Sequence, residues 1–223
     1  MRNISAWLII PQTNLHVGNE SVVNFTVIDK AIQRDVTTGI PCINSSSLKG
    51  AIKEFMTHKQ CNNKCNNIKE IFGSTKKDKN DSQKGSAVFF DATLLAIPEQ
   101  ITGGNSCYRL VHNKKIVDSF ITKATTLEIK NITYENIKSK IGVEVGKRFN
   151  ELCEDDNLPI IARNCLENGE STNLWYEQVL PSQSVLATII EGPRELEEAL
   201  DGKIVQIGAN ATIGYGYCKF IKL

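Results

Sequence analysis

Apolar residues are grouped in short runs that end at proline, glycine or polar clusters, and the spacing within each run predicts its secondary structure. The apolar run at residues 4–10 is rich in β-forming residues and stops at Pro11, which predicts a central strand. Further strands are expected at residues 40–43, 87–97 and 184–190, and within 204–221 on both sides of a glycine loop. Helices are expected at residues 48–56, 136–152 and 193–202. Strands and helices in both halves predict an α+β fold with the helices on one side of a sheet.

The helix expected at residues 48–56 has one apolar side and one basic side. Its apolar stripe, with the spacing of a half-buried helix, consists of Leu48, Ala51, Ile52, Phe55 and Met56. Ser46 or Ser47 is expected as the N-cap, and Lys49 and Lys53 lie away from the stripe. Free backbone N–H groups at such a helix start favour an anion such as phosphate. The alternative is a capped surface helix with solvated lysines.

A β-hairpin is expected at residues 159–181. Asn168-Gly169 is a typical two-residue turn between two stretches that can pair as strands. Trp175 and Tyr176 are adjacent, so in a strand they point to opposite sides, and at most one of them is a core residue. The other one could stack on a nucleobase.

Two polar residues lie beside apolar strands and have two interpretations each. His16 follows the first strand and either contacts a phosphate group of a ligand or makes structural hydrogen bonds. Asp91 interrupts the apolar run at 87–97 and needs a partner if it is buried. We favour a structural hydrogen-bond acceptor for Asp91, with a second active-site carboxylate as the alternative.

Composition and charge limit the organisation of the chain. A chain of 223 residues with 41% hydrophobic content can bury one good core, which predicts one domain. The net charge is only +1, but residues 1–150 carry 21 Lys+Arg against 13 Asp+Glu, whereas residues 151–201 carry 2 against 12. A basic body can neutralise nucleic-acid phosphates, and an acidic flank suits head-to-tail contacts between identical copies. The alternative for the flank is a solvated acidic surface.

The cysteines and the hydropathy pattern indicate a cytoplasmic protein. Seven scattered cysteines in a chain without an export signal favour free thiols. Cys61 and Cys65 could form half of a metal site, but no second pair follows them, so no structural zinc is expected. No run of 18 or more apolar residues exists, and no membrane association is expected.

Short motifs distributed in order along the chain resemble one known family. In the first quarter they are His16-Val-Gly18, Asp29-x-x-Ile-Gln-Arg-Asp35, Thr38-Gly-x-Pro41 and Ser46-Ser-Leu-Lys-Gly50. Further along they are Ile71-Phe-Gly-Ser74, Phe90-Asp-Ala-x-Leu-Leu95, Asn173-Leu-Trp-Tyr-Glu177 and Gln206-Ile-Gly-x-x-x-Thr-Ile-Gly-Tyr-Gly216. The first set resembles the RAMP proteins of type III CRISPR effector complexes. The second set is similar to the multicopy backbone subunits of the type III-B (Cmr) complexes.

The resemblance implies a modified ferredoxin-like (RRM-like) palm with inserted finger loops and a thumb β-hairpin. Residues 1–223 would form a single RAMP domain. The palm would comprise residues 1–57, 86–158 and 182–223, with a mobile insertion at about 58–85 and the thumb hairpin at about 159–181. The ordinary RRM aromatic motifs are absent, so base stacking on the sheet face is not expected.

The resemblance also implies a site. Asp29 matches the aspartate that the family uses for target cleavage, and it would assist the 2′-OH or bind a divalent cation, Mg or Mn. Asp91 and Glu177 are secondary candidates, either catalytic or structural. The RNA-binding candidates are His16, Lys30, Gln33, Arg34, Ser45, Ser46, Ser47, Lys49, Lys53, Arg163, Trp175, Tyr176, Gly208, Thr212 and Tyr215.

The implied function is that of a repeated backbone subunit that binds guide RNA and cleaves the complementary target RNA. An RNA strand supplies its own nucleophile, the 2′-OH, so in-line attack needs little more than positioning and one carboxylate. The implied partners are guide RNA, target RNA, further copies of the chain and other subunits of the type III-B complex. Two alternatives remain: a non-catalytic guide-RNA scaffold, and a guide-processing RAMP endoribonuclease that acts through His16 without a metal.

Overall fold

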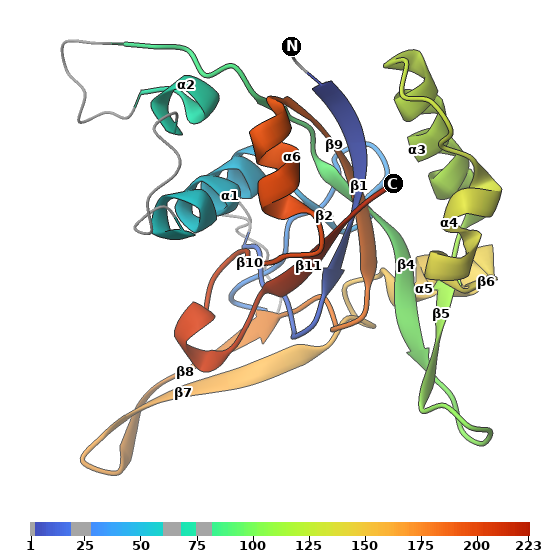
Figure 1. Ribbon diagram of the computed structural model, residues 1–223. Coiled ribbons are helices and arrows are strands. Elements are labelled where there is room, and N and C mark those ends of the chain that lie inside the picture. Colours follow the sequence, from blue (N-terminus) through green and yellow to red (C-terminus); the bar gives the residue numbers. More distant parts are fainter. Residues whose placement is uncertain (1–2, 19–27, 60–67, 75–81) are drawn as a thin grey trace.

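A large mixed sheet with helices on both of its faces forms the body of the protein (Figure 1). The computed structural model describes residues 3–18, 28–59, 68–74 and 82–223. The strands are β1 (Asn3–Pro11), β2 (Cys42–Ile43), β3 (Val88–Phe89), β4 (Ala92–Gln100), β5 (Tyr108–His112), β6 (Val143–Glu144), β7 (Ile160–Glu167), β8 (Glu170–Gln178), β9 (Val185–Gly192), β10 (Ile204–Gln206) and β11 (Tyr217–Lys222). The helices are α1 (Ser45–Lys59), α2 (Ile68–Phe72), α3 (Lys114–Thr126), α4 (Tyr134–Ile141), α5 (Gly146–Leu152) and α6 (Arg194–Leu200), with a 3-10 turn at Ala211–Ile213.

The centre of the sheet has ferredoxin-like topology. In the described part of the chain the strand order is β10-β11-β1-β9-β4-β5-β6, with β2 paired to β4 and β3 paired to β9. In the order β11, β1, β9 and β4 each strand is antiparallel to its neighbour. Helix α1 lies between β1 and β4 in the chain, and α6 connects β9 to β11 through β10. This is the βαββαβ arrangement, so the predicted α+β class and ferredoxin-like core are confirmed.

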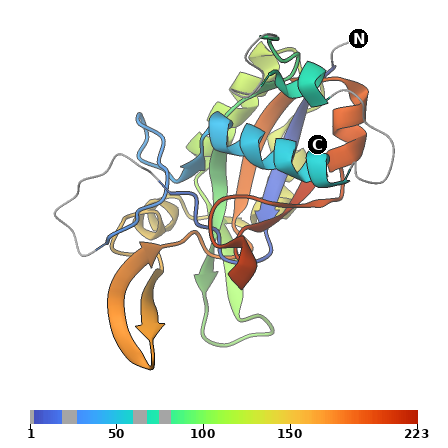
Figure 2. The same cartoon turned by 90° about the vertical axis from the view of Figure 1, so that its left-hand side faces the viewer.

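Both faces of the sheet are buried, which corrects the expectation of helices on one side. Trp7 and Ile9 of β1 belong to a core that includes residues of α1, α2 and α6. Ala6 and Leu8 point the other way, into a second core formed with α3 and α4. Alternate residues of a strand point to opposite faces, so a strand covered on both sides reads as a continuous apolar run. The views in Figures 1 and 2 show the two helical layers on either side of β1 and β9.

Three predicted elements have different limits in the structure. The helix expected at residues 136–152 is divided into α4 and α5 at Gly142, which has φ of 71°. A Cβ at Gly142 would lie 2.2 Å from the Leu110 carbonyl oxygen, so only glycine fits this approach. The strand expected at 87–97 is divided into β3 and β4. Part of the insertion expected at 58–85 forms α2, whose Ile71 and Phe72 are buried in the first core.

The β7–β8 hairpin projects from one end of the sheet, as both views show (Figures 1 and 2). Its turn is formed by Asn168 and Gly169 with φ of 51° and 86°, as the sequence predicts. Helix α6 and the strands on both sides of the glycine loop are also found where the sequence places them. None of the described helices combines the length and the apolar character needed to cross a bilayer.

Candidate nucleic-acid interface

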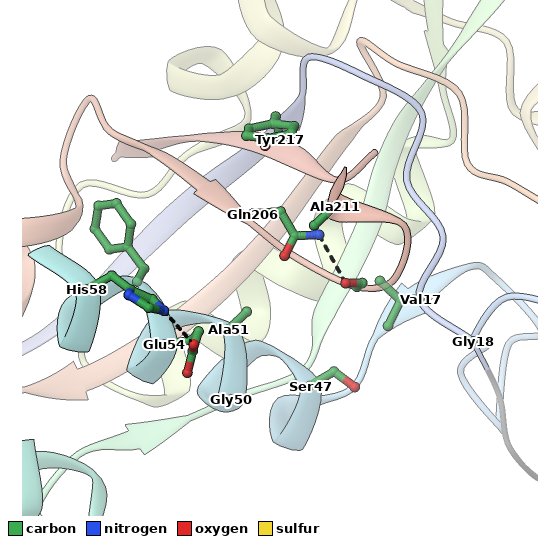
Figure 3. A pocket seen from close by; sticks show the side chains of 12 residues that line it. Val17, Gly18, Ser47, Gly50, Ala51, Glu54, His58, Gln206, Ala211 and Tyr217 are labelled. Atoms are coloured by element: carbon green, nitrogen blue, oxygen red, sulfur yellow. Dashed lines mark hydrogen bonds and ion pairs between the residues drawn. The ribbon is translucent and has the colours of Figure 1, made fainter. Parts of the chain in front are cut away.

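A groove of about 910 Å³, called here the α1 groove, runs along one side of α1 (Figure 3). Helix α1 contributes Ser47, Gly50, Ala51, Glu54, Phe55 and His58. The other residues of the lining are Val17, Gly18, Gln206, Gly208, Ala211 and Tyr217. The groove therefore lies between a helix and the loop that joins β10 to β11. Its volume is within the range of small-molecule and nucleotide sites.

The first turn of α1 is capped by a carboxylate, which corrects the predicted N-cap. The helix begins at Ser45, so the serines occupy its first turn and neither Ser46 nor Ser47 is the cap. The Ser45 backbone N–H donates to Asp91 Oδ1 over 2.6 Å. Asp91 is exposed, and it acts as a structural hydrogen-bond acceptor, which is the role that the sequence analysis favours. An anion at this helix start is already provided by the protein itself.

Gln33 fixes the segment before α1. Its side chain is buried, and its Nε2 donates to the Gly18 carbonyl oxygen and to Ser47 Oγ. Its Oε1 accepts from the Asn44 backbone N–H over 2.7 Å. Gln33 therefore connects the turn after β1 with the start of α1 and holds Gly18 and Ser47, two residues that line the groove.

Asp29 is exposed and is held by the base of the projecting hairpin. The backbone N–H groups of Asp29 and Lys30 each donate to the Tyr176 carbonyl oxygen over 3.1 Å. The Tyr176 N–H in turn donates to Asp29 Oδ2 over 2.7 Å. One carboxylate oxygen is therefore fixed by the hairpin, and the other, Oδ1, accepts no hydrogen bond from the described residues.

Glu177 is the centre of a buried polar cluster beside Asp29. Its Oε1 accepts from Lys30 Nζ over 3.0 Å and from Trp175 Nε1 over 2.8 Å. Its Oε2 accepts from Asn210 Nδ2 over 2.7 Å and from Arg163 Nε over 3.3 Å. Burial opposes ionisation of Glu177, but these hydrogen bonds from Trp175, Lys30 and Asn210 outweigh it and lower the pKa to about 2.

The same cluster attaches the glycine loop to the hairpin. The Arg163 guanidinium lies 4.8 Å from the centre of the Tyr215 ring, and the Lys30 ammonium lies 5.0 Å from that of Trp175. Gly208, with φ of 81°, passes so close to the turn after β1 that a Cβ would lie 2.2 Å from the His16 carbonyl oxygen. The loop thus packs against protein backbone at Gly208.

His16 and Arg34 are engaged in internal contacts. His16 is only 3% exposed, and its Nδ1 lies 2.7 Å from the Gln178 carbonyl oxygen. The Arg34 guanidinium donates to Asp155 Oδ1 and to the carbonyl oxygens of Gly39 and Cys153. Both residues support the architecture around the hairpin base in this structure.

The predicted RNA-binding residues form two groups. Ser47 and Gly208 line the α1 groove, and Lys30, Arg163, Trp175 and Tyr215 surround Glu177. Nine candidates lie outside both groups: His16, Gln33 and Arg34 with the internal contacts given above, Ser45, Ser46, Lys49 and Lys53 on α1, Thr212 in the 3-10 turn, and Tyr176 on the hairpin. Trp175 and Tyr176 are both half-buried. Sequence analysis missed Glu54, His58, Asn210 and Tyr217, which only the folded chain brings to these places.

The acidic residues of 151–201 do not form one surface. They lie at the end of α5 and after it, on the hairpin, and around α6, and several are paired, as in the Arg34–Asp155, Arg148–Glu151 and Lys222–Glu197 ion pairs. A contact between copies therefore cannot be assigned to a single acidic flank.

Protein ligands for a metal are few. Among the described residues, no three His, Cys, Asp or Glu side chains are grouped so that they could hold an ion. Both oxygens of Glu177 are already engaged, which leaves Asp29 as a single carboxylate. Cys61 and Cys65 lie outside the described residues.

The fold and the motif-bearing site define the class of protein. A sequence model of the RAMP superfamily matches residues 9–219, so the chain belongs to this superfamily. It is similar to the CRISPR system Cmr endoribonuclease Cmr4 of Pyrococcus furiosus, with 26% identity over 276 aligned positions that cover 93% of this chain and 91% of the relative. A CMR subunit Cmr4 of Saccharolobus solfataricus is 37% identical over 100 positions, which cover 45% of this chain and 30% of the relative.

Solved structures agree with the fold. A chain of the type III-B Cmr-beta complex bound to cognate target RNA has a TM-score of 0.77 at 20% identity, with 99% of this chain and 97% of that chain covered. Oligomeric Cmr4 from Pyrococcus furiosus has a TM-score of 0.67 at 19% identity, with 99% of each chain covered.

Proposed function

We propose that this chain is a repeated backbone subunit of a type III-B CRISPR ribonucleoprotein that binds guide RNA and cleaves the complementary target RNA. The observation that carries the proposal is the exposed Asp29 carboxylate, fixed by the hairpin backbone next to a cluster of Lys30, Arg163 and Trp175. The similarity over nearly the whole chain to a protein named an endoribonuclease supports it. The proposed partners are guide RNA, target RNA, further copies of the chain and other subunits of the complex, in the cytoplasm.

Asp29 is the proposed catalytic residue. Its Oδ2 accepts from the Tyr176 N–H, which fixes the direction of the carboxylate. Its Oδ1 would accept the proton of the 2′-OH as that oxygen attacks the adjacent phosphorus, and the 5′-oxygen of the next nucleotide would leave. Positioning and proton transfer of this kind account for large parts of an in-line reaction barrier.

A divalent cation fits this site only with ligands from the RNA. Magnesium keeps several waters and often binds through one or two carboxylates together with phosphate oxygens. As the alternative to accepting the proton of the 2′-OH, Asp29 Oδ1 would hold such an ion, which would supply charge stabilisation at the phosphate. The described residues do not offer the clustered carboxylates of a two-metal centre.

The β7–β8 hairpin is the proposed thumb of a single RAMP domain, because it projects from the sheet beside the proposed cleavage site. The residues that surround Glu177 are the proposed contacts to target RNA. The α1 groove, with Ser47 and Gly208, is the proposed place of the guide strand.

The decisive experiment compares Asp29→Ala with the unchanged chain in the assembled complex, on target RNA and on target RNA with a single 2′-deoxynucleotide at the cut position. We expect the variant to lose target cleavage by at least about a hundredfold while it retains guide and target binding. The deoxy substrate should resist the unchanged complex. Cleavage at the normal rate by Asp29→Ala would refute the assignment of Asp29.

One control variant tests the specificity of the Asp29 effect, and two further results distinguish the alternative functions. Asp156→Ala, an exposed carboxylate elsewhere, should cleave normally. If the chain is a non-catalytic scaffold, a complex in which no other subunit is a candidate nuclease should not cleave target RNA. The guide-processing alternative predicts cleavage of repeat RNA by the isolated chain. The burial of His16 does not favour that alternative, because its imidazole would have to become accessible.

A further inference from the structure

Arg163 has more hydrogen-bond donors than the folded chain uses. A guanidinium carries several N–H groups, but within the described part of the chain Arg163 makes one hydrogen bond, from Nε to Glu177 Oε2 over 3.3 Å. Its Nη2 is buried and has no hydrogen-bond partner there. Arg34 is the opposite case, because its guanidinium makes four hydrogen bonds, to Asp155 and to two carbonyl oxygens. A buried donor without an acceptor costs free energy, so the folding of the chain alone does not explain Arg163.

The buried cluster around Glu177 has an excess of positive charge. Lys30 and Arg163 are two cations that share one carboxylate. The nearby Asp29 carboxylate is bonded to the Tyr176 N–H and not to either cation. Each Glu177 oxygen already accepts from two donors, which fills the capacity of a carboxylate. The acceptor for Arg163 Nη2 must therefore come from a ligand, and an anion would also balance the charge.

Tyr215 covers the Arg163 guanidinium. Its half-buried ring has its centre 4.8 Å from Arg163 Cζ. The loop that carries Tyr215 lies beside β8, where Asn210 also contacts Glu177 (Figure 1). The Tyr215 hydroxyl makes no hydrogen bond to any described residue, and the neighbouring Gly214 has open space around it. The ring can therefore turn away from Arg163 without breaking a hydrogen bond of the described chain.

A phosphate group matches what the covered guanidinium lacks. The planar fork of an arginine donates to two phosphate oxygens at once, which a point charge such as lysine cannot do. In the proposed function, the residues around Glu177 contact target RNA, so phosphates of that strand would pass beside Arg163. The strand would thus supply both the missing acceptor and the missing negative charge.

We propose that Arg163 is a phosphate-binding residue for the target strand, and that Tyr215 keeps it covered until the strand arrives. Tyr215 then turns away, and phosphate oxygens accept from the guanidinium, including Nη2. This inference rests on the proposed function and adds a step to it, since a side chain must move before the target strand is fully bound. Arg163 is a positioning residue in this scheme, and it takes no part in the proton transfer assigned to Asp29.

The first experiment measures the affinity of the assembled, guide-loaded complex for target RNA that carries 2′-deoxynucleotides at the cut positions. We expect Tyr215→Ala to bind this RNA about threefold to tenfold more tightly than the unchanged chain, because the cover no longer has to be displaced. Tyr215→Phe keeps the ring and should bind like the unchanged chain. In a chain that already carries Arg163→Gln, Tyr215→Ala should change nothing, because no donor remains to be uncovered.

The second experiment repeats the measurement over a series of salt concentrations. Arg163→Gln should weaken binding and lower the slope of log affinity against log salt by about 0.7–0.9, the contribution of one phosphate contact. Arg163→Lys should keep the slope, because the charge remains, and should recover only part of the affinity. The matched control is Arg194→Gln on α6, an exposed arginine that should retain both affinity and slope.

The alternatives give different results. Weaker binding by Tyr215→Ala would mean that the ring stacks on a base of the strand, which overturns the proposal. An unchanged salt slope in Arg163→Gln would mean that no target phosphate reaches the guanidinium, which also overturns it. Tyr215→Ala leaves Arg163 and Glu177 in place, so its result does not depend on how the Arg163 variants fold. Absence of target binding by the unchanged complex would overturn the proposed function itself, whereas the other results concern this inference alone.

Discussion

Replacing Glu177 with glutamine tests whether the buried cluster at the hairpin base holds the structure together. Glutamine has nearly the same shape, but it removes the charge and places an NH₂ group among donors. The Lys30 ammonium is 52% exposed and can turn to water, whereas the Arg163 guanidinium is 21% exposed and would lose its anion. We therefore expect the variant to fold with a weakened attachment of the hairpin.

The expected loss of stability follows from the pKa of Glu177. The carboxyl has a reference pKa of 4.5 and a folded-state pKa of about 2. At about 1.4 kcal/mol for each unit, ionisation in the folded state contributes about 3 kcal/mol. Its side chain is 2% exposed, so solvent screening removes little of this value. For a chain of this size the melting temperature should fall by roughly 6–12 °C.

The pH dependence of unfolding provides the second measurement. A carboxyl whose pKa is lowered by folding stabilises the protein fully above its unfolded-state pKa, and the contribution is lost as the pH falls toward the folded-state pKa. The free energy of unfolding of the unchanged chain should therefore decrease from about pH 4.5 to about pH 2, in urea titrations at a series of pH values. Glu177→Gln should lack this part of the pH profile.

A matched control is Glu170→Gln on the same strand. Glu170 is exposed near the hairpin turn, so this variant should unfold within about 0.5 kcal/mol of the unchanged chain. The idea that Glu177 holds the hairpin base would be wrong if Glu177→Gln matched this control in stability and in pH profile.

Two further predictions concern the start of α1 and the loop between β10 and β11. Asp91→Ala should lower the free energy of unfolding, measured in urea, by about 1 kcal/mol because the Ser45 N–H loses its acceptor. Asp91→Asn should lose only about half of that free energy. Equal stability of the unchanged chain and both variants would refute the role of Asp91 as the cap of α1. Gly208→Ala should lower the free energy of unfolding by at least about 2 kcal/mol, because a Cβ would lie 2.2 Å from the His16 carbonyl oxygen. Gly214 has a similar positive φ but open space around it, so Gly214→Ala should lower the free energy of unfolding by about 1 kcal/mol. Similar losses in both glycine variants would show that backbone conformation alone determines the cost.

Local patterns were sufficient to predict the elements that depend on neighbouring residues. The Asn168-Gly169 turn is one example, because a turn with positive φ at both residues favours Asn and Gly. The strand β1 is another, because burial of both of its faces requires a continuous apolar run. Helix α3 also had a detectable signal. Asn113 caps it by accepting from the Lys115 N–H, and the spacing of Val117, Phe120 and Ala124 places them on one side. The helix at α4 was expected, but without α3 the sequence analysis did not predict that helices cover the second face of the sheet.

Tertiary contacts were not predictable in the same way. The division of the helix at Gly142 depends on the Leu110 carbonyl oxygen, which is distant in sequence. The role of Asp29 was inferred only from family resemblance, since a single exposed carboxylate has no periodicity. The partners of Glu177 come from three separate segments, which include Lys30, Arg163 and Asn210.

The position of Asp29 depends on a strand that lies 147 residues away in the chain. Tyr176 binds Asp29 and Lys30 through its backbone, and the adjacent Glu177 binds Lys30 and Asn210 through its side chain. The hairpin base is thus the common support for the segment that carries Asp29 and for the loop that borders the α1 groove. A displacement of the hairpin relative to the sheet must stretch these hydrogen bonds, so it moves the carboxylate and the groove wall together. A polynucleotide that contacts the hairpin would therefore act on both places through one set of bonds.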